Sequence, residues 1–543
     1  MRAEAASERR RVGPEPHPRD AVRDHLVLAV NGQLHRVGGE AAFGTLSDFL
    51  RRDRRLIGTK IVCSEGDCGA CSVLVGEPRR SEAPSVADGG GATADGLSSG
   101  ALRYRAIDSC IAFLHQLDGC HVITVEGLAG RAEAQSLAEL HPVQRSMVEC
   151  FGSQCGFCTP GFVIAITDLL AEQDRTGSAE LDDEELRVGL GGNLCRCTGY
   201  AQIVDAVREA ERSAQSLAPA ACADEQALAA VLGRASREPV RLEHRGRVLE
   251  LPRDEQRLLA ARAARPAARL VAGGTDLGVR FNKGQLSPSE DVIDLGGVAG
   301  FGGVRLLAAA AEDAAAGGRL VCGATARWSE LLDAIEGLPS LADLRQVLRR
   351  FGGPQIRNLG TVGGNLVNAS PIADSLPFLY VASARIELVS QRGARWLPIE
   401  QFYRGYKQLD LEPDELLRTV EVRVPDPGTG ERLLLLKASR RRDLDISTFT
   451  AALWMRLEGE RIDTVRLAFG GVGPTVLRLP RSEESLRGQR LEMERFRMAG
   501  EVASSEIRPI SDVRGAAAYR RLLARQVMES FFRRLHGEQE EVA

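Results

Sequence analysis

Two sets of cysteines have the spacing of metal ligands and together include most of the cysteines in the chain. In the first set, Cys63, Cys68 and Cys71 follow a Cys-x4-Cys-x2-Cys pattern, and Cys110 comes later. This spacing is typical of a plant-type [2Fe–2S] cluster, whereas structural zinc sites favour two closely spaced pairs. Glycine and alanine separate the three cysteines near the cluster, so the loop can turn backbone N–H groups toward the sulfurs.

The second set pairs Cys155 and Cys158 with Cys195 and Cys197. Each pair stands just before a predicted helix, the first beginning at Thr159-Pro160 and the second after Thr198-Gly199-Tyr200. Two helix N-termini that meet would place four thiolates in a positive field, which favours their ionised form. On spacing alone this set fits either zinc or an iron–sulfur cluster. Four further cysteines fit neither pattern and are interpreted as incidental thiols: Cys120, Cys150, Cys222 and Cys322.

Two glycine-rich segments indicate a phosphate-containing cofactor. Residues 269–277 form a predicted strand that runs into a Gly273-Gly274 turn, whose successive N–H groups suit a diphosphate. Residues 351–374 carry many small and polar residues, more than a simple core strand would. Either segment alone would also fit a tight turn near a core. No G-x-G-x-x-G lies between a predicted strand and helix, so the sequence shows no Rossmann site for a nicotinamide, and 296–303 is predicted to be a loop.

The elements that position these residues are too numerous for one core. The chain has 543 residues, is 44% hydrophobic and carries a net charge of -4. This composition predicts several globular domains and gives no reason to expect nucleic-acid binding. No run of 18 apolar residues is present, so no membrane span is predicted. Thiols at metal-ligand spacing and an N-terminus without an apolar signal segment predict a cytoplasmic location.

Changes in periodicity and composition divide the chain into predicted regions. Residues 25–134 alternate short strands with one helix, and residues 135–213 have helical periodicity. Ala/Gln/Ser-rich and Gly/Ser-rich stretches are expected to be irregular. The expected division is a disordered tail at 1–24, a β-rich domain at 25–134 with an insertion at 77–100, a helical domain at 135–213, a linker at 214–238, and α+β domains at 239–427 and 431–538.

The motifs around these sites resemble the molybdenum hydroxylase family. GTKIVCSEGDCGACSV is similar to its ferredoxin-like [2Fe–2S] domain, and CGFCTPG with GNLCRCTGY is similar to its helical [2Fe–2S] domain. The resemblance implies that both cysteine sets hold [2Fe–2S] clusters. RLVAGGTDL and FGGPQIRNLGTVGGN resemble the FAD domain of the same family. The implied contacts to FAD are Leu270, Val271, Ala272, Gly273, Gly274, Thr275, Asp276, Leu277, Phe351, Thr361, Asn365, Asp374, Leu417 and Lys437. A solvated surface charge is the alternative for Lys437.

The order of the domains resembles the small subunit of two-subunit xanthine dehydrogenases. It implies a multidomain α+β fold with a β-grasp ferredoxin-like domain, a helical [2Fe–2S] domain, an α+β FAD-binding domain and an α+β flavoprotein C-terminal domain. Electrons would pass from a molybdopterin-binding large subunit through the helical-domain cluster and the ferredoxin-like cluster to FAD and then NAD, in a heterotetramer that oxidises purines. Beyond the FAD site, no catalytic residue is expected on this chain. The alternatives are the same role in an aldehyde or N-heterocycle hydroxylase, or a zinc-binding assembly module.

Overall fold

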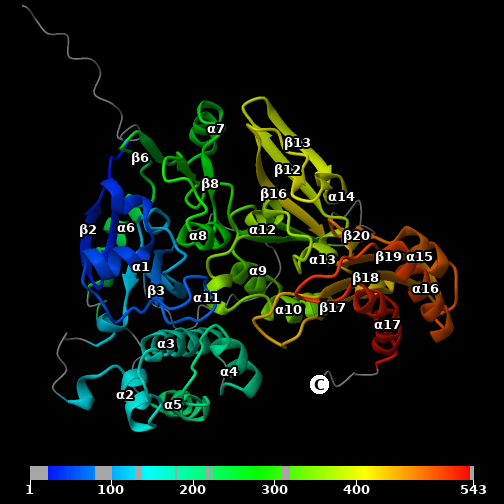
Figure 1. The fold of residues 1–543 in the computed structure, drawn as a ribbon, viewed down its shortest axis with the longest axis horizontal. Coiled ribbons are helices and arrows are strands. Elements are labelled where there is room, and N and C mark those ends of the chain that lie inside the picture. The colour runs from blue at the N-terminus through cyan, green and yellow to red at the C-terminus, as the bar shows by residue number, and fades with distance from the viewer. Residues whose placement is uncertain are drawn as a thin grey trace, which may run out of the picture.

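The computed structural model describes residues 22–79, 101–129, 136–177, 180–213, 219, 221, 224–308 and 318–537. Helices and sheets are mixed throughout this part of the chain, which confirms the predicted multidomain α+β fold. Figure 1 shows the N-terminal sheet at one end of the molecule, the C-terminal sheet at the other, and a group of helices beneath the N-terminal sheet. Within the described residues, no helix is both long and apolar enough to cross a membrane.

The N-terminal sheet is buried on both faces. Its strands are β1 (Leu26–Val30), β2 (Gln33–Val37), β3 (Ser72–Pro78), β4 (Leu102–Asp108) and β5 (His121–Ile123), in the order β2-β1-β5-β3-β4, and β1 runs parallel to β5. Side chains alternate between the faces. Val73 and Val75 pack in a core shared with strands of the predicted FAD-binding domain (239–427), called the FAD region below. Leu74 packs against the predicted helical domain (135–213), called the helical region. A short helix, α1 (Leu46–Asp48), continues into a π-helical turn at Phe49–Asp53.

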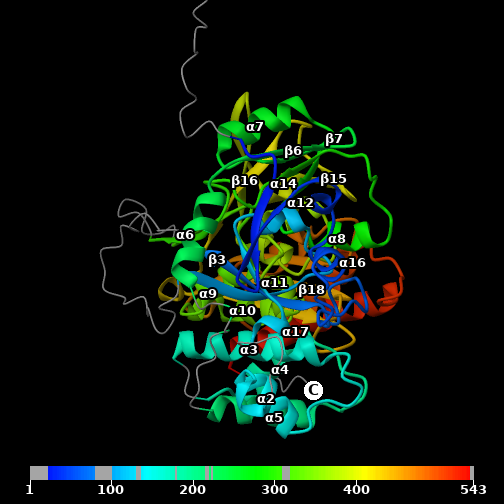
Figure 2. The ribbon, with the colours of Figure 1, turned by 90° about the vertical axis from the view of Figure 1, so that its left-hand side faces the viewer.

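The helical region covers the lower face of this sheet in Figures 1 and 2. It contains α2 (Pro142–Glu149), α3 (Thr159–Thr176), α4 (Asp183–Leu190) and α5 (Ala201–Arg212). Helix α3 lies next to the sheet and contacts β3 and β4. Phe162 and Ile166 of α3 share a core with Leu74 and Ile123, so burial of these apolar side chains attaches the helices to the sheet.

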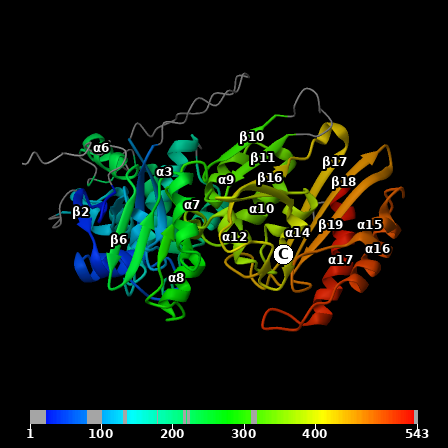
Figure 3. The ribbon, with the colours of Figure 1, turned by 90° about the horizontal axis from the view of Figure 1, so that it is seen from above.

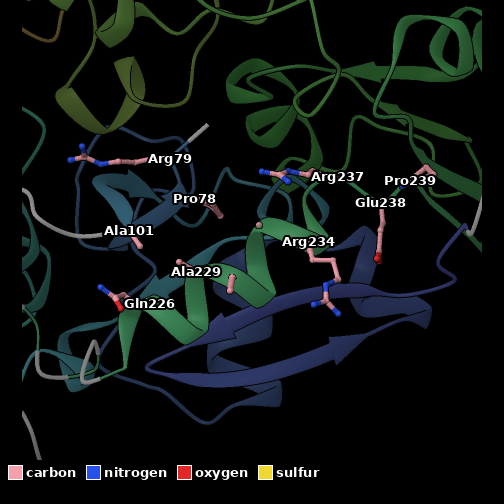
Figure 4. A pocket seen from close by; sticks show the side chains of 11 residues that line it. Pro78, Arg79, Ala101, Gln226, Ala229, Arg234, Arg237, Glu238 and Pro239 are labelled. Carbon is pink, nitrogen blue, oxygen red and sulfur yellow. The ribbon is translucent and has the colours of Figure 1, made fainter. Parts of the chain in front are cut away.

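The predicted linker is partly a helix. Helix α6 (Glu225–Ala235) begins after the capping residue Asp224 and packs on β1 and β3. Leu232 and Ala229 are buried against Ala29 and Leu102. A cavity of about 820 Å³ lies beside this helix and is lined in part by Arg234 and Arg237. Figure 4 shows the side chains that line it. The segment that connects two domains therefore also contributes to the core of the first one.

The FAD region contains two sheets. The first has the order β6-β7-β9-β8 and consists of β6 (Val240–His244), β7 (Arg247–Leu251), β8 (Arg269–Val271) and β9 (Val292–Asp294), with α7 (Glu255–Ala264) and α8 (Thr275–Asn282). The second has the order β10-β11-β16-β12-β13 and consists of β10 (Val304–Leu307), β11 (Arg319–Gly323), β12 (Arg385–Ser390), β13 (Gly393–Pro398) and β16 (Leu416–Arg423).

Six helices and a small hairpin accompany the second sheet in the described part of this region. The helices are α9 (Trp328–Ile335), α10 (Ala342–Arg349), α11 (Pro354–Arg357), α12 (Val362–Asn368), α13 (Leu376–Val381) and α14 (Ile399–Phe402). The hairpin pairs β14 (Tyr403–Gly405) with β15 (Gln408–Leu409). Helices α11 and α12 follow one another closely, because Thr361 caps the start of α12 four residues after α11 ends.

The C-terminal region is an antiparallel sheet covered by helices on one face (Figure 3). It contains β17 (Glu431–Ala438), β18 (Phe449–Glu458), β19 (Arg461–Gly470) and β20 (Leu477–Arg478), followed by α15 (Pro480–Leu486), α16 (Met493–Glu506) and α17 (Ala517–Leu535). Along β18, Leu453 and Met455 face the core formed with these helices, while Ala452 and Trp454 join the core of the FAD region. This alternation binds the two regions into one body.

The structure differs from two predictions for the N-terminal part of the chain. Arg23 lies within the tail predicted to be disordered, yet its guanidinium bonds the buried Asp118 at 2.6 Å and its backbone pairs with Val240. Residues 1–21 lie outside the described part. The predicted insertion begins too early, because Glu77 and Pro78 still belong to β3 and pair with β4; residues 80–100 lie outside the described part.

Candidate functional site

The four thiols of the first set come together where the N-terminal sheet meets the FAD region. Cys63 contacts both Cys68 and Cys110, and Cys110 contacts Cys71. Three of them are buried, with exposed fractions of 8% for Cys68 and 2% each for Cys71 and Cys110. The loop that carries Cys63 to Cys71 adopts left-handed backbone at Gly66 and Gly69, with φ angles of 78° and 63°.

Backbone N–H groups surround these sulfurs. The N–H of Glu65 donates to Cys63 Sγ at 3.4 Å. Hydrogen bonds from the Cys110 and Cys68 side chains hold the pKa of Cys63 well below its usual value and raise the pKa of both partners. The arrangement therefore favours at least one thiolate before any cluster is bound. N–H donors to sulfur also stabilise an added electron on an iron–sulfur cluster.

The second set joins two helix starts, as the sequence predicts. Cys158 immediately precedes α3, and Cys197 lies shortly before α5. The Sγ atoms of Cys197 and Cys155 are 3.5 Å apart, and Cys158 contacts Cys195. Cys155 and Cys197 are exposed, in contrast to the first set. The positive ends of the two helix dipoles meet at these thiols, which favours thiolate ligands.

Local hydrogen bonds separate the acidities of this second set. Burial opposes ionisation of Cys195, but hydrogen bonds donated by the hydroxyl and N–H of Thr198 lower its pKa to about 7. The N–H of Phe157, followed by the Cys197 thiol, lowers the pKa of Cys155. Burial raises the pKa of Cys158 to about 12. Thr198 therefore lowers the pKa of Cys195. The sequence had singled out only the cysteines of this motif.

The thiols of the first set form a chain of contacts from Cys68 through Cys63 and Cys110 to Cys71, whereas those of the second set form two pairs. Among the described residues, no group of three or more His, Cys, Asp or Glu side chains is arranged to hold a single metal ion. A structural zinc needs four ligands around one ion. A [2Fe–2S] cluster instead takes its four thiolates as two on each iron. Four thiols brought together at each site match the ligand set of a [2Fe–2S] cluster.

The two glycine-rich segments lie against each other. Gly273 approaches the second segment so closely that an added Cβ would lie 2.3 Å from the carbonyl oxygen of Leu359. Gly274 has a φ angle of 70° and precedes α8, while Thr361 caps α12 by accepting a hydrogen bond from Gly364. Two helix N-termini therefore start at one contact, with first-turn N–H groups that lack intrahelical partners. This cradle of N–H groups and small residues fits a diphosphate such as that of FAD.

The remaining predicted FAD contacts occupy different surroundings. Asp374 accepts hydrogen bonds at 2.5 Å from both Lys437 and Ser447, and the Lys437 side chain is 2% exposed. A solvated surface role for Lys437 is therefore wrong. Leu417 is buried in β16, and Asn365 accepts a hydrogen bond from Ser375.

Phe351 is half-buried and packs edge-on against Trp328. The structure thus brings residues 270–277 close to Thr361 and pairs Asp374 with Lys437, and it gives Leu417 and Phe351 packing roles. Their contacts to FAD stay predictions. Of the four incidental cysteines, Cys120 and Cys322 are buried, Cys150 is half-buried, and Cys222 lies outside the described part.

Two buried amides join the sites and were not predicted. Asn193 Nδ2 donates to the carbonyl oxygen of Gly69 at 3.1 Å, and Gln355 Nε2 donates to Asn193 Oδ1 at 2.8 Å. Asn193 lies two residues before Cys195, and Gln355 lies in the glycine-rich FAD segment. Polar residues inside otherwise small-residue motifs are the sequence signal that could have identified them.

Comparison with known proteins assigns the domains. The chain matches the [2Fe-2S] binding domain family at 124–208, the FAD binding domain in molybdopterin dehydrogenase at 246–427, and the CO dehydrogenase flavoprotein C-terminal domain at 435–535. These matches, in this order, show that the chain carries the electron-transfer FAD and [2Fe–2S] module of the molybdenum hydroxylases. Its cofactors include FAD and a [2Fe–2S] cluster.

The chain is also similar to individual curated proteins. The chain is 29% identical to xanthine dehydrogenase 1 of Arabidopsis thaliana, over 93% of this chain and 39% of the relative, and 30% identical to xanthine dehydrogenase of Drosophila subobscura, over 92% and 38%. It therefore spans about two fifths of the length of these relatives. Among solved structures, a carbon monoxide dehydrogenase from Hydrogenophaga pseudoflava matches 52% of this chain and 94% of its own, at 25% identity and a TM-score of 0.46.

Proposed function

We propose that this chain is the electron-transfer subunit of a xanthine dehydrogenase. In this role it receives electrons from a molybdopterin-binding partner subunit and delivers them through two [2Fe–2S] clusters and FAD to NAD, while the partner oxidises a purine. The cysteine ligands, the FAD contacts and a heterotetramer with two copies of each subunit belong to the same proposal. When bound, the clusters carry single electrons and FAD converts them to a two-electron transfer.

The spatial order of the sites is the observation that carries this proposal. Cys155 and Cys197 are exposed at one end, on the helical region. The buried thiols of the first set lie between them and the FAD region, since Ile111, next to Cys110, contacts Val279 of α8. The two loops also touch directly, because the N–H of Leu194 donates to the carbonyl oxygen of Cys68 at 3.0 Å. The first set therefore contacts both the helical site and the FAD region, as a middle position in the proposed electron path requires.

The exposed end suits a protein partner. Phe157, Leu194 and Tyr200 surround the helical thiols and are 50%, 47% and 38% exposed. Apolar side chains in such a position are typical of an interface core, where they exclude water from the site. We therefore assign the molybdopterin partner to this face, from which electrons would enter the chain.

Purification with the endogenous partner tests the proposal. We expect xanthine-dependent NAD reduction by the complex, and two [2Fe–2S] signals by electron paramagnetic resonance together with FAD. Activity with aldehydes but not xanthine would instead identify a different molybdenum hydroxylase.

A cysteine substitution tests the ligand assignment. Cys195→Ser is expected to remove one cluster signal while the FAD content stays near that of the wild type, because the described part of the FAD region shares its hydrophobic core with the N-terminal sheet and not with the helices beside Cys195. Cys150→Ser, in the same helical region, serves as the matched control and should keep both signals. Loss of neither signal in Cys195→Ser would exclude Cys195 as a ligand.

A further inference from the structure

Three regions of the chain meet at one buried point between the two thiol sites. The ferredoxin-like loop contributes Cys68 and Gly69, the helical region contributes Asn193 and Leu194, and α11 of the FAD region contributes Gln355. Asn193 is 3% exposed and Gln355 is 1% exposed. The packing is close enough that a Cβ on Gly69 would lie 2.4 Å from the amide nitrogen of Asn193.

The orientation of both amides follows from their partners. The carbonyl oxygen of Gly69 can only accept a hydrogen bond, so it requires the Nδ2 donor of Asn193. The Oδ1 atom of Asn193 therefore faces Gln355 and must receive a donor, which Nε2 supplies. Gln355 also donates to the hydroxyl of Ser72 at 3.4 Å, and Ser72 in turn donates to Gly69. A residue without an N–H at position 355 would leave a buried acceptor unsatisfied.

The backbone contact beside this amide pair links a proposed ligand of each cluster. Leu194 donates its N–H to the carbonyl oxygen of Cys68, and Leu194 is covalently joined to Cys195. The connection from Cys68 to Cys195 therefore consists of covalent bonds and a single hydrogen bond. Asn193, adjacent to Leu194, holds the neighbouring carbonyl of Gly69, so the two contacts move together.

We propose that this contact is the route by which electrons cross between the two clusters, and that Gln355 is the positioning residue that holds it. The inference rests on the ligand assignment proposed above. Each crossing oxidises the helical-domain cluster by one electron and reduces the ferredoxin-like cluster by one electron, without any bond or proton being exchanged. Gln355 belongs to the FAD region, which holds neither cluster. The position of the FAD region against the other two regions therefore affects how well the two clusters are coupled.

Gln355→Met in the full chain tests this role, because methionine keeps the length of the side chain and removes the donor. After reduction with dithionite, the magnetic interaction between the two reduced clusters in electron paramagnetic resonance should weaken. After flash reduction, electron transfer between clusters should slow roughly ten-fold, less than the ~100-fold that a 1 Å misplacement can cost an oriented reaction. Iron and FAD content should stay at the wild-type level.

Asn358→Leu is the matched control. Asn358 follows α11, is buried, and donates to the carbonyl oxygen of Ala106 on β4, which makes it a similar contact between the same two regions away from the cluster loops. It should leave the cluster interaction unchanged. Equal slowing in this control, or an unchanged rate in Gln355→Met, would overturn the proposal.

Asn193→Ala probes the same contact from the helical side. If Gln355→Met loses iron or FAD, the rate of electron transfer in Asn193→Ala decides the outcome. When both substitutions are combined, electron transfer between the clusters should be no slower than in Asn193→Ala alone. Absence of two cluster signals in the wild type would contradict the ligand assignment instead of the route.

Discussion

His121 is held in a neutral form by its hydrogen bonds. The N–H of Gly32 donates to its Nε2 atom at 2.9 Å, so that nitrogen carries no proton. Its other ring nitrogen lies 2.8 Å from the hydroxyl of Tyr104. Burial lowers the pKa of His121 from 6.5 to about 4, because a charged imidazole would lose its hydration. The protonation of His121 therefore makes the stability of the N-terminal sheet depend on pH.

The sign of the pH dependence follows from this shift. Between pH 6.5 and 4 the unfolded chain binds a proton at His121 that the folded chain excludes. The stabilisation is complete above pH 6.5 and is lost as the pH falls to 4, by about 3 kcal/mol in the free energy of unfolding. Urea unfolding at pH 7 and pH 5 should show a smaller decline in His121→Gln than in the wild type. The exposed His536→Gln should match the wild type, and an unchanged decline in His121→Gln would contradict the assignment.

Single residues also show what the sequence can and cannot predict about the site. The grouping of the eight cysteines into two sets was predictable because metal-ligand spacing is mostly local, and the structure brings each set together. The partners of Asp374 and Lys437 were not, since these residues are far apart in the chain and their pairing depends on how β17 packs on the FAD region. The same holds for Asn193 and Gln355, whose contact forms across two domain boundaries.

At the scale of elements, α6 shows how composition can mislead. Residues 214–238 are rich in Ala, Gln and Ser, which resembles a linker, but Ala and Gln also favour helices. Ala229, Leu232 and Ala235 lie on one side of this helix and are buried. The strands and long helices were predictable because their periodicity is strong, whereas a short helix with a narrow apolar face gives a weak signal.

Two neighbouring positions on α6 give a direct test of its packing. Leu232→Ala should lower the free energy of unfolding by about 2–5 kcal/mol, because Leu232 is fully buried and its removal leaves a cavity. Val231→Ala should change it by about 0.5 kcal/mol or less, because Val231 is 42% exposed. Urea unfolding of the full chain measures both. Similar losses in the two variants would show that α6 does not pack as described.

At the scale of the whole molecule, the FAD region and the N-terminal sheet share one hydrophobic core. Val271 and Val292 of the FAD region share a hydrophobic core with Val73 and Val122 of the sheet. Asn282, at the end of α8, donates to the carbonyl oxygen of Cys110 at 2.9 Å. The distance between the ferredoxin-like thiols and the FAD region is therefore fixed by packing and does not depend on a flexible hinge.

Gly278 on α8 tests this close contact. A Cβ at this position would lie 2.2 Å from the carbonyl oxygen of Ile111, so Gly278→Ala should push α8 away from the loop beside Cys110 and destabilise the chain by about 1–3 kcal/mol. Gly233→Ala on α6 is the control, since the nearest atom would be 3.6 Å away, and it should stabilise by about 0.5–1 kcal/mol. Thermal unfolding and the rate of FAD reduction by the clusters measure both effects. Equal behaviour of the two variants would contradict the proposed contact.

The unequal exposure of the two thiol sets implies an order of maturation. Cys68, Cys71 and Cys110 are covered by α8 and α11, so on the proposed ligand assignment a cluster enters that site before the FAD region has finished folding. Cys155 and Cys197 stay accessible in the folded chain. On the same assignment, the helical site can be filled after the chain has folded, but before the proposed partner covers this face.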